Sequence, residues 1–284
     1  MTVAVTGATG QLGALVINEL LLTTEPGSIV AVVRDPAKAA GLAARGVQVR
    51  QAAYDDPQGL RAAFAGVDTL LFISSSEAGR RVEQHGNVVD AAVAAGVGRV
   101  AYTSAPRATT TGLALAPEHK FTEEYLAATG LPFTILRHNW YTENYLGQIE
   151  TARATGTVVA AAGDGRVASA SRADFAAADA TVLTEPGHEG KVYELGGDHA
   201  WDFNELADAL SQIVGRPVTY RAVDPPTLSG ILQGVGLDAG TAGFVAQLDD
   251  DIAHGALAET TGELSKLIGR PTTPLLDGLR AASA

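Results

Sequence analysis

The sequence predicts an α/β fold, with a doubly wound parallel sheet followed by a smaller C-terminal α/β lobe. Short β-branched runs alternate with Ala- and Leu-rich amphipathic stretches, a glycine-rich turn follows the first run, and the regularity fades beyond about residue 145. A chain of 284 residues suffices for one large domain and an appendage. We therefore expect a nucleotide-binding domain over 1–145 and a substrate-binding lobe over 146–284, some of whose strands return to the main sheet.

Six strands are expected in the first domain, each a short apolar run between turn residues, at 3–6, 29–33, 47–51, 69–73, 100–103 and 133–136. Helices fill the gaps. Asp35-Pro36 marks a helix start, because a carboxylate can cap a helix whose first position proline occupies. The lobe is expected to hold a strand at 191–195 and helices at 204–214 and 262–268.

Composition restricts the classes of partner and chemistry. With 20 Lys+Arg against 32 Asp+Glu, the net charge of −12 repels nucleic acid and anionic membranes. The absence of cysteine excludes disulfides, thiolate nucleophiles and iron–sulfur clusters, and the six histidines show no metal-ligand spacing, so we expect no metal. No signal peptide or membrane span is recognisable, which predicts a cytoplasmic protein. The run Asp249-Asp250-Asp251 is interpreted as a solvated helix end.

The glycine-rich turn predicts a Rossmann-type dinucleotide site. Gly7 permits a tight turn after the first strand, Gly10 lets the backbone approach a pyrophosphate, and Gly13 lets the next helix pack closely. The helix N-terminus then faces the phosphates with free N–H groups and a positive dipole end. The other loop residues expected to line the cofactor are Ala8, Thr9, Gln11 and Leu12.

Two further positions bear on the choice of cofactor. Rossmann-type domains that bind NAD usually carry an acid near the end of the second strand. This chain has Arg34 there, and a guanidinium suits the 2′-phosphate of NADP. Asp35 is accounted for as a helix cap, although its proximity leaves the strictness of NADPH over NADH open. The small hydroxyl side chains of Ser74, Ser75 and Ser76 follow the fourth strand and are expected to bind the cofactor's ribose or phosphates.

The acid–base pair of alcohol dehydrogenases is missing. Short-chain dehydrogenases that act on alcohols use Tyr-x-x-x-Lys, but the residues four places before the lysines are Arg34, Ala116, Gly187 and Gly262. The place of the pair falls near His119 and Glu123, with Ser104 after the fifth strand. His119 could act as an acid, but a histidine on a helix face is more often structural.

Several motifs together resemble the NmrA-like atypical short-chain dehydrogenases, in particular the bacterial NAD(P)H:quinone oxidoreductases of type 2. The resemblance covers nearly the whole chain. It rests on Thr6–Gly13, Arg34-Asp35-Pro36, Ser74–Glu77, Asn139–Tyr145, Ala161–Gly165, His188–Leu195 and Leu264–Gly269.

This resemblance implies reduction of a quinone by NADPH without a flavin. It adds to the cofactor-binding residues His138, Asn139, Trp140, Tyr141, Thr142, Glu143 and Arg172. An ion pair of Arg172 with Asp174 is an equally good interpretation of that residue. Hydride transfer to an electron-poor quinone is downhill, so orientation can suffice without a positioned acid.

The substrate is expected to be a small quinone. We expect Trp140, Tyr141 and Tyr145 to shape its slot and Asn144 to bond a quinone oxygen, unless these aromatics are core residues. Two alternatives stay open: a non-catalytic NADP sensor that binds a protein partner, and a reductase of another activated carbonyl or an imine. The sequence leaves the physiological quinone, the proton donor and the oligomeric state undetermined.

Overall fold

The computed structural model describes residues 1–283, which form two compact units. The first unit comprises residues 1–109, 115–138 and 172–194, and the second comprises residues 110–114, 139–171 and those from 195 onward. The predicted boundary at residue 145 differs from this division. Apart from residues 110–114, the chain stays in the first unit up to residue 138, leaves it, returns to it for one helix and one strand, and then leaves again.

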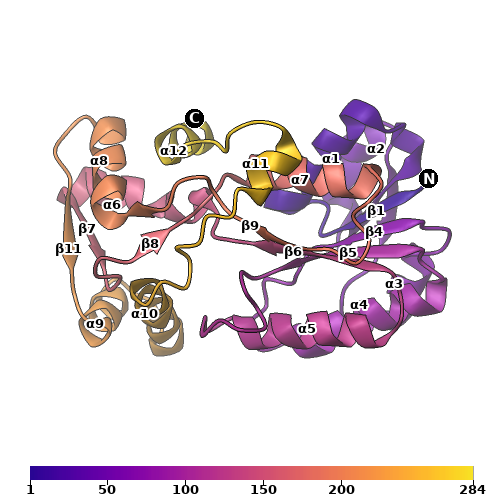
Figure 1. The fold of residues 1–284 in the computed structure, drawn as a ribbon, viewed down its shortest axis with the longest axis horizontal. Coiled ribbons are helices and arrows are strands. Elements are labelled where there is room, and N and C mark those ends of the chain that lie inside the picture. Colours follow the sequence, from indigo (N-terminus) through magenta and orange to yellow (C-terminus); the bar gives the residue numbers. More distant parts are fainter. Residues whose placement is uncertain (284) are drawn as a thin grey trace. The chain divides into compact units, whose positions relative to one another are not determined.

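The first unit is built on a seven-stranded sheet in the order β3-β2-β1-β4-β5-β6-β9 (Figure 1). The pairings β1–β2, β1–β4, β2–β3, β4–β5 and β5–β6 are all parallel. The reversal of strand order beside β1 is typical of a doubly wound sheet, so the predicted Rossmann-type fold is confirmed. The strands are β1 (Val3–Thr6), β2 (Ile29–Val33), β3 (Gln48–Gln51), β4 (Thr69–Phe72), β5 (Arg99–Ser104), β6 (Phe133–His138) and β9 (Val192–Leu195).

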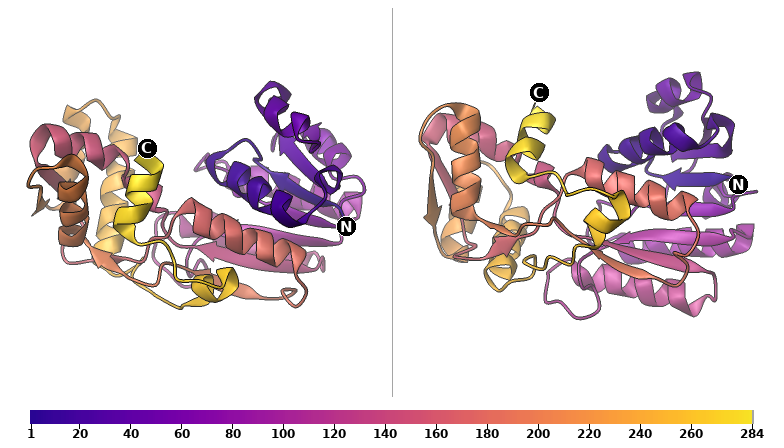
Figure 2. Two further views of the ribbon diagram at one scale, coloured as in Figure 1. Left: turned by 90° about the horizontal axis from the view of Figure 1, so that it is seen from above. Right: turned by 45° about the horizontal axis from the view of Figure 1, so that its top comes forward.

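Helices cover both faces of this sheet. On one face α1 (Gln11–Thr23) and α7 (Arg172–Thr184) lie side by side (Figures 1 and 2). On the other face α4 packs against both α3 and α5. The remaining helical segments of the unit are η1 (Pro26–Ser28), η2 (Pro36–Ala39), α2 (Ala40–Ala44), α3 (Pro57–Ala63), α4 (Arg81–Ala95) and α5 (Ala116–Ala128).

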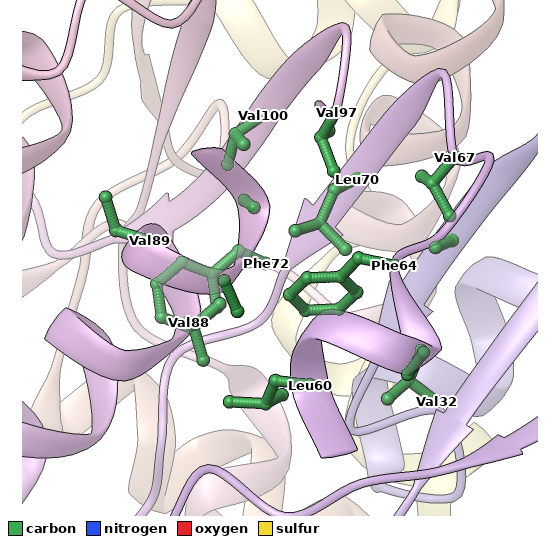
Figure 3. Close-up of a cluster of buried hydrophobic side chains, with 14 of the residues drawn as sticks. Val32, Leu60, Phe64, Val67, Leu70, Phe72, Val88, Val89, Val97 and Val100 are labelled. Atoms are coloured by element: carbon green, nitrogen blue, oxygen red, sulfur yellow. The ribbon is translucent and has the colours of Figure 1, made fainter. Parts of the chain in front are cut away.

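The core beneath α3 and α4 shows why these segments fold as they do. Leu70 and Phe72 alternate along β4 toward this face, while Leu60 and Phe64 project from α3 to meet them (Figure 3). All four side chains are fully buried. Removal of such side chains from water contributes roughly 2 kcal/mol each.

The second unit contains two small sheets of two strands each, together with helices. β7 (Thr157–Ala160) pairs in parallel with β11 (Thr219–Ala222), and β8 (Arg166–Val167) pairs antiparallel with β10 (Trp201–Asp202). α6 packs with α8, and α9 with α10. The helices are η3 (Thr142–Tyr145), α6 (Gly147–Thr155), α8 (Phe203–Val214), α9 (Pro225–Gly234), α10 (Ala239–Ala253), α11 (Glu263–Ile268) and α12 (Leu275–Ser283). None of the helices within residues 1–283 is long and apolar enough to cross a membrane.

Most expected elements occur at the expected places. Every predicted strand is present, and its ends differ from the predicted ones by at most two residues. Asp35 accepts a hydrogen bond from the Ala37 N–H, as expected of a cap, although the segment it caps is a 3-10 helix. The solvated interpretation of the acidic run was wrong, because Asp249 and Asp251 accept backbone N–H groups of Ala161 and Ala114, both at 2.8 Å.

Candidate functional site

The glycine-rich turn between β1 and α1 adopts a backbone that side chains would disrupt. Gly7 has φ +58°, in the left-handed region that glycine favours, and its carbonyl accepts the Gly10 N–H at 2.8 Å. A Cβ on Gly13 would collide with the Gly7 carbonyl oxygen and lie 2.9 Å from Ala8 Cα. The first turn of α1 therefore packs directly on the loop that precedes it.

The N-terminus of α1 is left uncapped by this arrangement. Gly10 is the N-cap residue, and no side chain within residues 1–283 accepts a hydrogen bond from the first turn. Helix N-termini carry backbone N–H groups without intrahelical partners and a partial positive charge of roughly half a unit. The start of α1 is therefore suited to bind an anion such as a pyrophosphate.

A pocket of about 510 Å³ in the first unit opens at this helix start. Its walls come from the loops that follow β1, β2, β3 and β4, at the carboxyl edge of the sheet where ligands bind in open α/β folds. The lining residues are Gly7, Thr9, Gly10, Gln11, Leu12, Gly13, Val32, Val33, Arg34, Asp35, Lys38, Ala52, Ala53, Tyr54, Asp55, Ile73, Ser74, Ser75, Ser76, Glu77 and Gln84. The pocket thus unites the glycine loop, Arg34 and the serine run, while Ala8 is fully buried.

Arg34 and Lys38 give one side of the pocket its positive charge. The Arg34 side chain is 77% exposed and its Nη1 lies 3.5 Å from Glu77 Oε1, which is a weak surface pair. Asp35 also lines the pocket, but its carboxylate is engaged with the Ala37 N–H at 3.0 Å. A guanidinium and an ammonium beside an occupied carboxylate favour an anionic group at this position.

The three serines after β4 have different environments. Ser75 is only 8% exposed and its hydroxyl donates to Gln84 Oε1 at 2.6 Å. Ser74 is half-buried, and its N–H donates to the Thr103 hydroxyl at 2.9 Å. Ser76 is exposed. All three serines line the pocket, but the hydroxyl of Ser75 is already hydrogen-bonded to another side chain of the protein.

The sequence reasoning did not single out Lys38, Tyr54, Asp55 and Gln84 among the pocket residues. Lys38 could have been found because it lies only four residues after Arg34, in the short helix that follows β2. Tyr54 and Asp55 follow β3, so the rule that ligands bind at the carboxyl ends of strands pointed to them. The Tyr54 hydroxyl lies 2.6 Å from both the Thr6 hydroxyl and the Ile73 carbonyl oxygen, and burial raises the pKa of Tyr54.

The place of the missing Tyr-x-x-x-Lys pair is filled by a buried ion-pair network. Ser104 donates to Glu123 Oε1, and Arg137 bonds both oxygens of the same carboxylate, with Nη2 2.6 Å from Oε2. Arg137 Nη1 also lies 2.7 Å from Glu194 Oε1. His119 is bonded to the Tyr102 hydroxyl at 2.8 Å. Ser104 and Glu123 thus link β5, α5 and β6.

The side chain of His138 is held inside the first unit. Its Nε2 lies 2.9 Å from Asp179 Oδ1 on α7, and its ring stacks on Phe175 at 4.5 Å between centroids. Both members of the His138–Asp179 pair are buried. The imidazole therefore fixes the end of β6 against α7.

In the second unit, the segment 139–145 is only partly accessible. Asn139 donates to the Leu257 carbonyl and accepts the Trp140 N–H, and Thr142 bonds the Ser169 hydroxyl at 2.9 Å. Tyr145 is 8% exposed and packs edge-on against Trp201, with ring centroids 4.9 Å apart. Trp140, Tyr141 and Glu143 are half-buried, and Asn144 is exposed.

Arg172 belongs to the first unit, where it begins α7 and is half-buried, and Asp174 in the same turn is fully buried. Their roles stay predictions. Among residues 1–283 no group of three or more histidines, aspartates and glutamates has an arrangement that could hold a metal ion.

A parallel sheet with a glycine loop, an uncapped helix and a basic pocket at its carboxyl edge defines the class of dinucleotide-binding Rossmann-type proteins. The comparisons with known proteins agree. Residues 7–186 match a family model described as NAD(P)H-binding, and the chain belongs to this family.

Comparisons with individual proteins show which members of the family this chain is similar to. The chain is 50% identical to quinone oxidoreductase 2 of Escherichia coli over 277 residues, covering 98% of this chain and 97% of that protein. It is 30% identical to an NmrA-like family domain-containing oxidoreductase of Aspergillus flavus, covering 99% and 94%. The crystal structure of an E. coli NADPH-dependent quinone oxidoreductase complexed with NADPH matches with TM-score 0.96 and 49% identity over 100% of both chains. The predicted relationship to NmrA-like proteins and type 2 quinone oxidoreductases is confirmed.

Proposed function

We propose that the protein is an NADPH-dependent quinone reductase that works without a flavin or a metal. The observation that carries the proposal is the pocket at the uncapped start of α1, with Arg34 and Lys38 on its charged side. The similarity along the full chain to a quinone oxidoreductase of E. coli supports the reaction type.

The pocket fits NADPH in its residues and in its backbone. Gly10 and Gly13 leave the space at the start of α1 that side chains would fill, and the N–H groups there can bind a pyrophosphate. Arg34 and Lys38 can bind a 2′-phosphate, which NADH lacks. Asp35 caps the Ala37 N–H through Oδ1, so one of its two carboxylate oxygens is already engaged.

The chemistry needs little acid–base help from the chain. When bound, NADPH supplies a hydride, and a quinone that accepts the hydride and one proton becomes a hydroquinone. The Ser104–Glu123–Arg137 network offers no tyrosine to donate that proton, so we assign the proton to water or to a neighbouring hydroxyl. The protein's contribution is then to bind and orient the reactants.

Substrate binding is assigned to segment 140–145. Trp140 and Tyr141 offer half-buried aromatic surface, and we assign the bond to a quinone oxygen to Asn144, which is an exposed residue. Tyr145, packed on Trp201, supports this segment from the interior of its unit. His138, Asn139, Thr142, Glu143 and Arg172 remain proposed cofactor residues; the internal bonds of Asn139 and Thr142 favour a supporting role for their side chains.

The test follows reduced-nicotinamide absorbance with purified protein, with and without a soluble benzoquinone, using NADPH and NADH in parallel. We expect quinone-dependent oxidation that prefers NADPH. Tight NADPH binding without turnover of any quinone would instead support a sensor, and turnover of imines or enones alone would support a different reductase.

Cofactor choice is tested by Arg34→Ala. Loss of a charge-assisted bond to phosphate should lower the NADPH/NADH ratio of kcat/KM by about tenfold to a hundredfold, since such bonds contribute about 1.5–3 kcal/mol. Arg61→Ala is the matched control, because Arg61 is exposed on α3 and does not line the pocket. An unchanged ratio in R34A would remove Arg34 from phosphate binding.

A further inference from the structure

Ser75 is bonded at each of its polar groups. Its N–H donates to His85 Nε2 at 3.0 Å, and its carbonyl accepts from Arg81 Nε at 2.7 Å. Its hydroxyl donates to Gln84 and accepts the Glu77 N–H. Three of these four partners lie on the first turns of α4. Hydrogen bonds between Ser75 and α4 therefore hold the loop that follows β4 and lines the pocket.

The bond from Ser75 determines the tautomer of His85. A backbone N–H can only donate, so Nε2 of His85 must be the acceptor and Nδ1 must carry the proton. Nδ1 lies 2.8 Å from the Thr122 hydroxyl on α5, which in turn donates to the Glu118 carbonyl at 2.9 Å. Thr122 therefore accepts from Nδ1 and stabilises the tautomer that Ser75 requires.

The surroundings of His85 keep its ring neutral. The side chain is fully buried and stands edge-on to Phe72, with ring centroids 4.9 Å apart. Burial, with lesser contributions from His119 and Arg81, lowers the pKa of His85 to about 3. Since a protonated ring would turn a second donor toward the Ser75 N–H, the neutral form is the one that the loop needs.

We propose that His85 is a positioning residue of the NADPH site: its neutral ring, oriented by Thr122, holds the Ser75 N–H and so fixes the pocket wall formed by residues 73–76. Ile73, Ser74 and Ser76 line the pocket on either side of this anchor. The inference deepens the proposed function, because it rests on NADPH binding in this pocket. It connects α5, which contributes no residue to the pocket lining, to cofactor affinity.

The first test compares His85→Leu with His85→Gln, because the glutamine oxygen can accept at the place of Nε2 and leucine cannot. An unsatisfied buried N–H costs about 1–3 kcal/mol, so H85L should weaken NADPH binding about tenfold. We expect the same rise in the KM for NADPH, with kcat at saturating NADPH changed by less than about twofold. H85Q should restore most of the affinity.

His119→Leu is the matched control. His119 is also buried in this core, and it bonds the Tyr102 hydroxyl, which lies 3.4 Å from His85 Nδ1, but it makes no bond to the pocket loop. H119L should lower the melting temperature while the dissociation constant of NADPH stays within about twofold of wild type. Equal affinities in H85L and wild type, or equal losses in H85L and H119L, would overturn the proposal.

Thr122→Val and Thr122→Ser test the same link without removing the imidazole. T122V should weaken NADPH binding about threefold to tenfold and T122S should retain it, because serine keeps the hydroxyl. Ring-nitrogen NMR of His85 should show the Nδ1–H tautomer in wild type and a loss of that preference in T122V. An Nε2–H tautomer in wild type would contradict the assignment even if H85L did not fold.

The binding titration separates this inference from the proposed reaction. Failure to reduce any quinone would remove the proposed activity and leave the effect of His85 on NADPH affinity measurable. Absence of NADPH binding by the wild-type protein would overturn both.

Discussion

The glycine loop was expected to bind the cofactor, and the segment 138–145 to bind the cofactor through residues 138–143 and the quinone through its aromatic residues and Asn144, yet the two regions are built in opposite ways. In the loop, neighbours in the chain determine the geometry, and the binding surface arises from what glycine lacks. In the segment, distant partners such as Asp179 and Leu257 occupy the side chains of His138 and Asn139. The binding surface of a local motif can thus be predicted from the sequence, whereas the sequence of a polar and aromatic run does not show which of its side chains are accessible.

The largest effect on NADPH binding is expected from a substitution that disrupts the glycine loop. Gly13→Ala places a methyl group against the Gly7 carbonyl oxygen and Ala8 Cα, which are backbone atoms that cannot turn aside. Overpacking of this kind costs about 1–3 kcal/mol, so NADPH binding should weaken by up to about a hundredfold. Gly41→Ala on α2 is the control, because its Cβ meets open space. Wild-type affinity in G13A would show that the loop tolerates a side chain.

The next effect concerns Asp249, a partly buried acid of the second unit. Burial raises the pKa of Asp249 from 3.8 to about 6, against the bond from the Ala161 N–H. Because the folded state then binds a proton more tightly than the unfolded state, the contribution of Asp249 to stability is greatest below about pH 4 and is lost as the pH rises through about 6. The ionised carboxylate should cost about 2 kcal/mol at pH 8 after allowance for its partial exposure.

Asp249→Asn removes that cost and keeps an oxygen for the Ala161 N–H. We expect D249N to raise the free energy of unfolding by about 2 kcal/mol at about pH 8 and by little at about pH 4, measured by urea unfolding. Asp250→Asn, one residue on, serves as the control, since Asp250 has an exposed side chain paired only at 3.8 Å with His254. A gain independent of pH would refute the ionisation argument.

Two asparagines of segment 138–145 allow a buried side chain to be compared with an exposed one. Asn139 is buried, and both its amide nitrogen and its amide oxygen form hydrogen bonds within the protein. Asn139→Ala should therefore lower the free energy of unfolding by about 1–2 kcal/mol. Asn144 is exposed, so Asn144→Ala should leave stability nearly unchanged and lower quinone turnover about tenfold, with NADPH affinity retained. Equal losses of turnover and NADPH affinity in N144A would exclude its assigned role.

The smallest effect is expected at Tyr145. Its hydroxyl is buried and, among the described residues, makes no hydrogen bond, while the ring packs on Trp201 and Phe203. Tyr145→Phe should therefore change the free energy of unfolding by less than about 1 kcal/mol, or raise it slightly. Thermal unfolding together with quinone turnover measures this. A large loss of turnover would show that the hydroxyl takes part in the reaction.

The sequence by itself determined the sheet, the glycine loop and the basic residue after β2. Short apolar runs between turn residues identify the strands, and the steric demands of Gly7 and Gly13 act between residues that are neighbours in the chain. The absence of a Tyr-x-x-x-Lys pair was equally readable. These signals are local, so they need no knowledge of the packing.

Only the tertiary structure decided how these parts are used. The return of α7 and β9 to the first unit depends on burial against α1 and β6, residues far away in the chain. The same holds for the burial of Ser75 in a run of three serines and for the ionisation of Asp249 in an acidic run that appeared solvated. Burial and hydrogen-bond partnership are set by residues distant in sequence, and composition carries no record of which distant residues meet.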